Sequence, residues 1–534
     1  MINLTNIHFG YSKKRMLFSE LNLNLTPGHI YGLLGKNGAG KTTLLKIISG
    51  LLFSQNGTAD VMGKRAELRD PDILKEIYFL PEEMYIPHLK IRNYARVYSP
   101  FYPSFSMEEF NKYLDEFEVN DREQYADKLS HGQQKKLLIS FALATNTRIL
   151  LLDEPTNGLD IPSKSIFRRV MASSTNEDRL VIISTHQVRD LHSLIDSVII
   201  LDNGDIIFNQ PSDIITEKLV FKVEDNDVDL KSVLYSEDNV RGLLVVKENS
   251  EHLESKLDIE LLFNAIVANK KRIKEIFESK INNQIKNNNM STISLNRIQY
   301  LFSKYFIENW KKDISNFLIL FIIAGFSGYQ LDLSLSVIIF VILAFIYAGR
   351  VFGMFSHKPK GMNYLLIPAS TAEKTIVNLI LVNVYYLSAL FISCVAGLIF
   401  GNLLNSLIHN YSFTWDFVKQ AISFDYTTFL PLLLCESMLI FGSIYFKRKA
   451  VIKTFLYLFC FGLLIMMVDS SLVYFLTENH SIPFSTSNLY METSVTAENS
   501  FFNQYGTLLF TVSSIFFILF FWVLSFLRLK ETEV

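Results

Sequence analysis

A glycine-rich loop near the N-terminus constrains the fold of this chain more than any other feature. Residues 35–42 read Gly-Lys-Asn-Gly-Ala-Gly-Lys-Thr, which matches the G-x-x-x-x-G-K-[ST] pattern of phosphate-binding loops. An apolar run, 29–34, precedes the loop, and a helical pattern, 43–52, follows it. Glycines let the backbone N–H groups of such a loop surround phosphate oxygens at the positive end of the next helix. The loop therefore predicts a nucleotide-binding domain in which a strand leads into a helix.

The loop also predicts which side chains meet the nucleotide. Lys41 is expected to neutralise the β- and γ-phosphates of ATP, and the Thr42 hydroxyl is expected to ligate Mg²⁺. The other residues predicted to bind ATP are Gly35, Asn37, Gly38, Ala39, Gly40 and Thr43.

Two adjacent carboxylates follow a later apolar run. Residues 149–154 read Ile-Leu-Leu-Leu-Asp-Glu. Asp153 is placed at the strand tip to reach Mg²⁺, usually through water, and Glu154 is the candidate that polarises the attacking water. Standing alone, two acidic residues would more simply cap a strand. Because the phosphate-binding loop precedes them, they predict hydrolysis of ATP.

Between these motifs lies the segment Leu129-Ser130-His131-Gly132-Gln133. With it, residues 1–218 resemble the ATP-binding cassette (ABC) family, whose signature is L-S-G-G-Q. His131 replaces the first glycine of that signature, while Ser130, Gly132 and Gln133 remain. In this family the signature of one cassette faces the phosphate loop of another. The resemblance therefore implies a dimer, most simply a homodimer, in which the signature acts on the partner's ATP.

The resemblance implies further roles for single residues. Tyr11 is implied to stack on adenine, Asp160 to be the turn acid in Gly-Leu-Asp, and His186 to be the catalytic switch histidine. The family usually has glutamine where this chain has Glu82. A carboxylate there could help hold Mg²⁺, but it adds negative charge beside the γ-phosphate. A role in coupling to the membrane is the open alternative.

Composition changes sharply along the chain and divides it into domains. Residues 1–290 carry charges throughout, whereas long apolar runs dominate from about residue 314. Alternating strand and helix patterns predict an α/β P-loop NTPase domain with a largely parallel sheet, followed by an all-α transmembrane domain. The predicted parts are a cassette (1–218), its appendage (219–277), a linker (278–292), an amphipathic helix in the membrane interface (293–312) and the membrane domain (313–534).

Six apolar runs near or above the length of a bilayer span follow. They cover about 314–331, 333–356, 375–404, 427–446, 451–476 and 505–527. Lys and Arg concentrate in alternate loops and after the last run, so the positive-inside rule places both chain ends in the cytoplasm. We therefore expect a multi-pass protein in the cytoplasmic (inner) membrane of a prokaryote. The near balance of 51 basic and 53 acidic residues gives no indication of nucleic-acid binding.

Polar residues in the apolar half suggest where the membrane domain acts. Residues 365–374 resemble the coupling helix of O-antigen exporters and ABCG-like transporters, with Pro368 in the loop and Ser370 and Glu373 spaced as a capping box. Glu436 and Asp469 fall inside spans, where a carboxylate is costly. Glu436 is either a contact on the substrate path or a structural residue between packed helices. For Asp469 the structural interpretation is favoured.

Together these features predict an ATPase that exports a hydrophobic or amphipathic substrate such as a peptide, lipid, glycolipid or drug. The predicted partners are a second copy of the chain, membrane lipids and this cargo. The alternative is a membrane-anchored ABC ATPase that transmits force or a signal to an envelope partner without transporting cargo.

Overall fold

The computed structural model divides the chain into two compact units. Residues Met1–Glu308 and Met362–Ser370 form the N-terminal unit, and Asn309–Gly361 and Thr371–Thr532 form the helical unit. The structure describes residues 1–12, 15–187, 191–224, 233–239, 242–250, 253–277, 294–356, 358–409, 413, 415, 418–419, 426–446, 452–457, 459 and 501–532.

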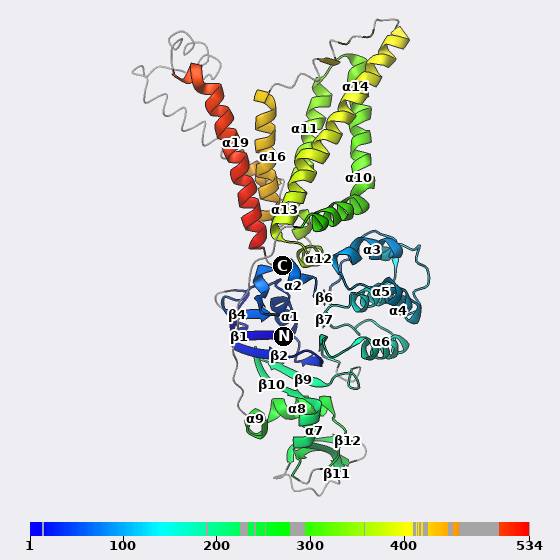
Figure 1. Cartoon of the computed structure of the whole chain (residues 1–534), viewed down its shortest axis with the longest axis vertical. Coiled ribbons are helices and arrows are strands. Elements are labelled where there is room, and N and C mark those ends of the chain that lie inside the picture. Colours follow the sequence, from blue (N-terminus) through cyan, green and yellow to red (C-terminus); the bar gives the residue numbers. More distant parts are fainter. Residues whose placement is uncertain are drawn as a thin grey trace. The chain divides into compact units, whose positions relative to one another are not determined.

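A six-stranded sheet forms the centre of the N-terminal unit (Figure 1). Its strands lie in the order β10-β9-β3-β8-β7-β6, and all neighbours are parallel except the pair β9 and β10. Their bounds are β3 Ile30–Leu34, β6 Ile77–Leu80, β7 Ile149–Asp153, β8 Leu180–Thr185, β9 Ser197–Asp202 and β10 Asp205–Pro211. Strands β3, β7, β8 and β9 are buried along their whole length, as expected for the interior of a parallel sheet.

Helices between these strands place the sequence motifs. Helix α1 (Lys41–Ile48) follows β3, while α5 (His131–Ala144) and α6 (Ile161–Ser174) precede β7 and β8. Further helices are α2 (Pro71–Leu74), α3 (Ile91–Tyr98), α4 (Met107–Glu116) and α7 (Ser212–Lys218). Because β3, β6, β7 and β8 run parallel, their carboxyl ends meet at one edge of the sheet, where α/β folds bind ligands.

The described part of the N-terminal unit also contains two smaller antiparallel sheets. One has the order β2-β1-β4-β5, with β1 Ile2–Phe9, β2 Phe18–Leu25, β4 Asn56–Val61 and β5 Lys64–Arg65. The other has the order β11-β13-β12, with β11 Leu219–Glu224, β12 Val233–Asn239 and β13 Gly242–Glu248. Helices α8 (Ile259–Ala268) and α9 (Lys270–Phe277) follow the second sheet. These elements occupy the range predicted as an appendage.

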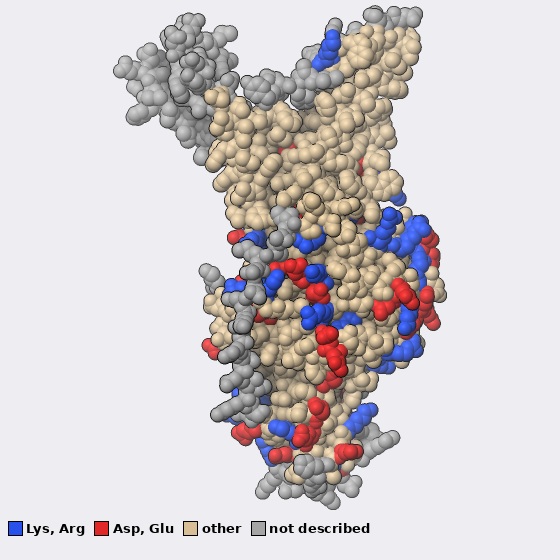
Figure 2. All heavy atoms as spheres, in the orientation of Figure 1, with Lys and Arg blue, Asp and Glu red and all other residues tan. Residues whose placement is uncertain are grey.

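Within the described residues, the helical unit contains several apolar helices. They are α10 (Leu295–Gln330, whose first residues belong to the N-terminal unit), α11 (Ser334–Ala348), α13 (Thr371–Ile380), α14 (Leu387–His409), α16 (Tyr426–Tyr445) and α19 (Phe501–Lys530). A π-helical segment, Leu381–Tyr386, joins α13 to α14. Within the described residues, Leu295–Gln330, Thr371–His409 and Thr511–Lys530 are long and apolar enough to cross a membrane. Figure 2 shows charged side chains gathered on the N-terminal unit and few on the visible face of the helical unit.

Glycines bring α10 and α14 into backbone contact. A Cβ atom at Gly401 would lie 1.8 Å from the carbonyl oxygen of Gly325, and one at Gly397 would lie 2.4 Å from that of Phe321. Gly397 and Gly401 are four residues apart and therefore share one face of α14. Small residues four positions apart allow two helix backbones to approach each other closely.

The structure confirms the α/β P-loop NTPase fold followed by a region with several apolar helices. It differs in detail from the predicted segments. The amphipathic segment 293–312 and the first apolar run are one continuous helix, α10, since no breaker separates them. The second run, 333–356, is a shorter helix that ends at Ala348. The linker 278–292, Asp469 and most of the fifth run lie outside the described residues.

Candidate ATP-binding site

The glycine-rich loop leaves the end of β3 and enters α1, as its sequence predicts. Gly35 has no room for a side chain, because a Cβ atom there would lie 2.4 Å from the carbonyl oxygen of Leu201. Gly40 has a φ of +112°, which a residue with a side chain rarely adopts. These two glycines therefore fix the path of the loop on either side of its turn.

Lys41 lies buried under this loop. Its Nζ atom donates to the carbonyl oxygens of Gly35 at 2.8 Å and of Lys36 at 3.4 Å. Burial lowers the pKa of Lys41, while the nearby carboxylates of Glu154, Asp153 and Glu82 raise it. An ammonium group held in this way can meet phosphate oxygens at little cost in side-chain ordering.

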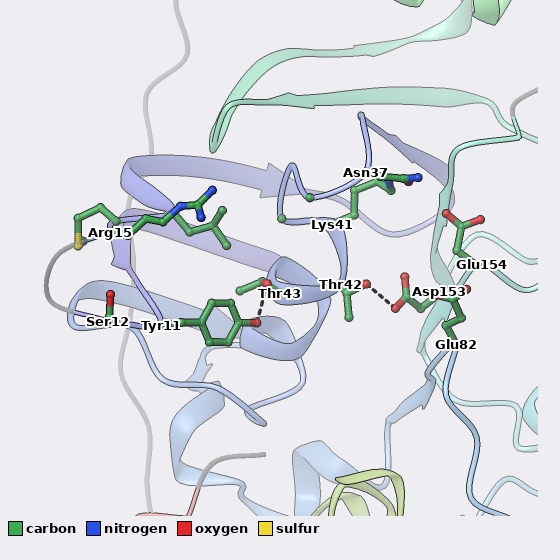
Figure 3. Close-up of a pocket in the computed structure, with 14 residues that line it drawn as sticks. Tyr11, Ser12, Arg15, Asn37, Lys41, Thr42, Thr43, Glu82, Asp153 and Glu154 are labelled. Carbon is green, nitrogen blue, oxygen red and sulfur yellow. Dashed lines mark hydrogen bonds between the residues drawn. The ribbon is translucent and has the colours of Figure 1, made fainter.

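Asp153 joins the carboxyl ends of β7 and β8 to the loop. The Thr42 hydroxyl donates to Asp153 Oδ2 at 2.7 Å (Figure 3). The Ser184 hydroxyl donates to Asp153 Oδ1. Ser184 is the register partner of Asp153 on β8. Asp153 is only 1% exposed, so its two oxygens are held in fixed directions.

The oxygens of Thr42 and Asp153 fit a magnesium ion. No group of three or more His, Cys, Asp or Glu that could hold a metal occurs among the described residues. Mg²⁺ does not need one, because it commonly binds through one or two carboxylates, substrate phosphates and water.

Glu154 directly follows Asp153, at the point where the chain leaves β7. Its φ is +49°, in the left-handed region, and its N–H contacts the carbonyl oxygen of Ser184 at 3.1 Å. One carboxylate oxygen, Oε1, lies 2.8 Å from Nδ1 of His186, just beyond β8. The structure thus brings the predicted pair Glu154 and His186 together.

Residues of the glycine-rich loop and the nearby carboxylates line a pocket of about 480 Å³, a volume typical of small-molecule sites. Its lining includes Tyr11, Asn37, Gly38, Gly40, Lys41, Thr42, Thr43, Glu82, Asp153 and Glu154. Tyr11 is 69% exposed, and its hydroxyl lies 2.9 Å from the Thr43 hydroxyl. Figure 3 shows the loop residues Asn37 and Lys41 facing the three carboxylates. Most of the Tyr11 side chain is thus open to solvent.

The signature residues and Asp160 cap helices outside this lining. Ser130 caps α5 in a capping box with Gln133, and Asp160 caps α6 through the N–H of Ser163 at 2.9 Å. Gly132 lies in the first turn of α5.

Glu82, which lines the pocket, accepts a hydrogen bond from Asn157 Nδ2 at 3.1 Å, which ties it to the turn after Glu154.

Three groups of contacts are not predicted by the sequence patterns. The first is Ser184, a hydroxyl residue directly across from Asp153, which only the alignment of the two strands brings to the site. The second is Lys135, two residues after the signature segment, whose buried Nζ atom donates to the backbone carbonyl oxygen of Glu154. The third is a cluster around Tyr98, whose hydroxyl donates to Glu308 Oε1 at 2.9 Å and accepts from Asn363 Nδ2 at 3.4 Å. Such long-range pairs leave no spacing signal in a single sequence.

The segment predicted as a coupling helix spans three elements. It covers the end of α12 (Lys358–Leu366), a turn containing Pro368, and the beginning of α13. Ser370 directly precedes α13, and Glu373 lies in the first turn of that helix. The short helix in this loop is therefore α12, while the capping-box spacing marks the beginning of a long apolar helix.

Comparisons with known proteins agree with this site. The family model described as ABC transporter matches residues 18–157. An uncharacterized ABC transporter ATP-binding protein of Methanocaldococcus jannaschii is 29% identical over 49% of this chain and 97% of that protein. The bacitracin transport ATP-binding protein of Bacillus licheniformis is 29% identical over 40% of this chain and 70% of its own length. The Nod factor export ATP-binding protein of Rhizobium etli is 28% identical over 40% of this chain and 70% of its own length.

Among solved structures, a dimeric bacterial ABC transporter cassette is 24% identical and covers 40% of this chain and 98% of its own, with a TM-score of 0.36. The family model covers the phosphate loop, the signature segment and both carboxylates. The N-terminal domain of this chain is therefore an ABC transporter ATP-binding cassette, an ATPase domain that binds ATP.

Proposed function

We propose that this chain is an ATP-driven exporter of a hydrophobic or amphipathic substrate across the cytoplasmic membrane. The observation that carries the proposal is one chain in which a complete set of ATP-site groups is followed by apolar helices of membrane-spanning length. Two of the relatives are named for bacitracin transport and for Nod factor export.

In the proposed reaction, Glu154 is the general base. Its carboxylate takes the proton from water as the water oxygen attacks the γ-phosphorus of ATP, and the bond to the β-phosphate oxygen breaks. His186, 2.8 Å from that carboxylate, orients it. Lys41 balances the charge that develops on the phosphate oxygens, and the loop N–H groups hold the phosphates in place.

Mg²⁺ would be held by Thr42 and Asp153, where it would supply charge to the phosphate oxygens. Glu82 is a further proposed ligand, and its hydrogen bond to Asn157 gives it a second role in fixing the turn after Glu154. Tyr11 is proposed to stack on the base.

Two copies of the chain are proposed to work together. Ser130, Gly132 and Gln133 lie outside the pocket lining of their own cassette, which suits residues that act on the ATP of a partner. Asp160, at the N-terminus of α6, is proposed to lie at the same interface. Homodimer formation is the simplest arrangement for one cassette per chain.

The cluster around Tyr98 supports coupling between ATP hydrolysis and the membrane helices. Tyr98 ends α3 of the cassette, Glu308 belongs to the first part of α10, and Asn363 belongs to α12. Lys304 pairs with Glu308 at 2.9 Å and lies over the Tyr98 ring at 5.4 Å from its centre. A movement of α3 would therefore displace the first part of α10 and α12, two segments that lead into apolar helices. Pro368, Ser370 and Glu373 follow directly and are proposed to belong to this route.

Glu436 is the proposed substrate-path residue within the helical unit. It is fully buried, and neither carboxylate oxygen has a hydrogen-bond partner in the part of the chain that the structure describes. A carboxylate at such a position suits a cationic group on a cargo molecule.

The test is transport by the full chain in proteoliposomes supplied with ATP. Fluorescent lipids, glycolipids and amphipathic peptides are offered as candidate cargo, and Glu154→Gln protein is reconstituted in parallel. We expect ATP-dependent movement of at least one class, absent from the Glu154→Gln vesicles. Normal ATP turnover with no class moved would contradict export and favour the force-transmitting alternative.

A further inference from the structure

Lys135 is a buried cation that none of the ATP-site motifs includes. It lies one turn into α5, four residues after His131, and is 1% exposed. Its Nζ atom donates to the backbone carbonyl oxygen of Glu154 at 2.8 Å. Unlike Lys41, it is not among the residues that line the pocket, so it approaches Glu154 from within the protein.

This contact completes the support of an unusual backbone position. Glu154 has a φ of +49°, which costs free energy for any residue that carries a Cβ atom. Its N–H bonds the carbonyl oxygen of Ser184 on one side, and its own carbonyl oxygen is bonded by Lys135 on the other. Both peptide groups of Glu154 are thus fixed, and they set the direction in which its side chain leaves the backbone toward His186.

The positive charge of Lys135 also acts on the carboxylates around Glu154. Burial lowers the pKa of its ammonium group, and the carboxylates of Glu82, Asp153 and Glu154 oppose that shift. Three carboxylates gathered around one site repel each other, and a fixed cation behind them lessens that repulsion.

We propose that Lys135 is a positioning residue for ATP hydrolysis, which holds the left-handed backbone of Glu154 and so aims its carboxylate. The inference rests on the proposed role of Glu154 as general base. Because Lys135 lies on the helix whose first turn carries the signature residues, it also joins that helix rigidly to Glu154 of the same cassette.

The first experiment compares steady-state ATP hydrolysis by the purified full chain and by Lys135→Met, which keeps the length of the side chain but removes its donor and charge. We expect kcat to fall about ten- to hundredfold with KM for ATP unchanged within about twofold, since a small misplacement of a reacting group costs this much. Lys135→Arg should recover part of the loss. Lys136→Met, on the same helix, is the matched control and should keep the original kcat.

The second experiment asks whether Lys135 acts through Glu154. In single-turnover hydrolysis, the double variant Lys135→Met/Glu154→Gln should be no slower than Glu154→Gln alone. A further loss in the double variant of the same factor as in Lys135→Met would overturn the proposal. So would a kcat of Lys135→Met within twofold of the original, or a loss explained wholly by a lower melting temperature.

Two outcomes separate this inference from the proposed function. If Glu154→Gln hydrolyses ATP normally, the assignment of the base is wrong. If Glu154→Gln is inactive while Lys135→Met is fully active, only the positioning role is wrong. Should Lys135→Met not fold, Lys135→Leu, which also removes the donor and the charge, is tested by the same kcat and KM comparison and judged by the same limits.

Discussion

Glycine is used differently in the N-terminal unit and in the helical unit. In the ATP site, Gly40 adopts a left-handed backbone, so the loop can turn around phosphates. In the helical unit, Gly401 lies within a regular helix and lets α14 contact the backbone of α10. The first use shapes a ligand site and the second only brings helices together. Loss of the first should therefore affect binding, and loss of the second should affect stability.

Buried carboxylates also differ between the two units, in whether they have hydrogen-bond partners. Asp153 and Glu154 each have partners on another element, Thr42 and His186 among them. Glu436 is as deeply buried, yet its oxygens have no hydrogen-bond partner within the described residues. The carboxylates of the ATP site thus have protein partners, whereas that of Glu436 has none among the described residues.

The largest expected effect is that of Lys41→Ala. Removing the buried ammonium group should weaken ATP binding roughly a hundredfold, or about 3 kcal/mol, because charge-assisted bonds to phosphate are lost. Equilibrium binding of a fluorescent ATP analogue measures it. Lys36→Ala, which removes an exposed side chain from the same loop, is the matched control. Equal affinity of the Lys41→Ala and Lys36→Ala proteins would refute the role of Lys41.

The next effect belongs to the helical unit. Gly401→Ala forces α10 and α14 apart and should destabilise this unit by about 1–3 kcal/mol, while ATP affinity stays the same. All three cysteines of the chain lie beyond residue 393, so thiol labelling during heating reports on this unit.

The control for this glycine is Gly353→Ala, since a Cβ atom at Gly353 meets nothing within 4 Å. If ATP affinity fell together with thiol protection in Gly401→Ala, the separation of roles between the two units would be wrong.

A smaller effect is expected at the edge of the pocket. Tyr11→Ala should weaken ATP binding by about 1 kcal/mol, the scale of one aromatic contact. Tyr11→Phe keeps the ring and loses only the contact with Thr43, so its affinity should lie between those of the original protein and Tyr11→Ala. An unchanged affinity of both variants would show that Tyr11 is only a surface aromatic residue.

The smallest effect concerns Asp160 and depends on pH. Hydrogen bonds from Ser163 hold the pKa of Asp160 below its usual value. A carboxyl whose pKa is lowered by folding adds stability above its unfolded pKa and loses it as pH falls through the folded pKa. Asp160→Asn should therefore be slightly less stable than the original protein at neutral pH and equally stable in acid. Thermal unfolding at both pH values measures this, and a difference that grew in acid would contradict it.

The ATP site was largely predictable from sequence, for a physical reason. Parallel strands bring their carboxyl ends to one edge, so motifs after β3, β7 and β8 had to meet there. Lys41, Thr42, Asp153, Glu154 and His186 lie where this rule places them. Lys135 could not be predicted, because its contact depends on how deeply α5 packs against the sheet.

The helical unit was less predictable. Apolar runs indicated its helices, but hydropathy does not say where a helix continues through a polar stretch. Hydropathy therefore predicts a separate segment around Lys304 and Glu308 and a span after it, whereas the two are one helix, α10. The close contact of Gly325 with Gly401 likewise requires knowledge of which helices are neighbours.

The central claim, that Glu154 performs hydrolysis at this site, is tested most directly by single-turnover conversion of ATP by purified Glu154→Gln protein. We expect ATP still to bind with nearly its original affinity, while its conversion to ADP slows by about a hundredfold or more. Conversion at the original rate would show that Glu154 is not the catalytic base.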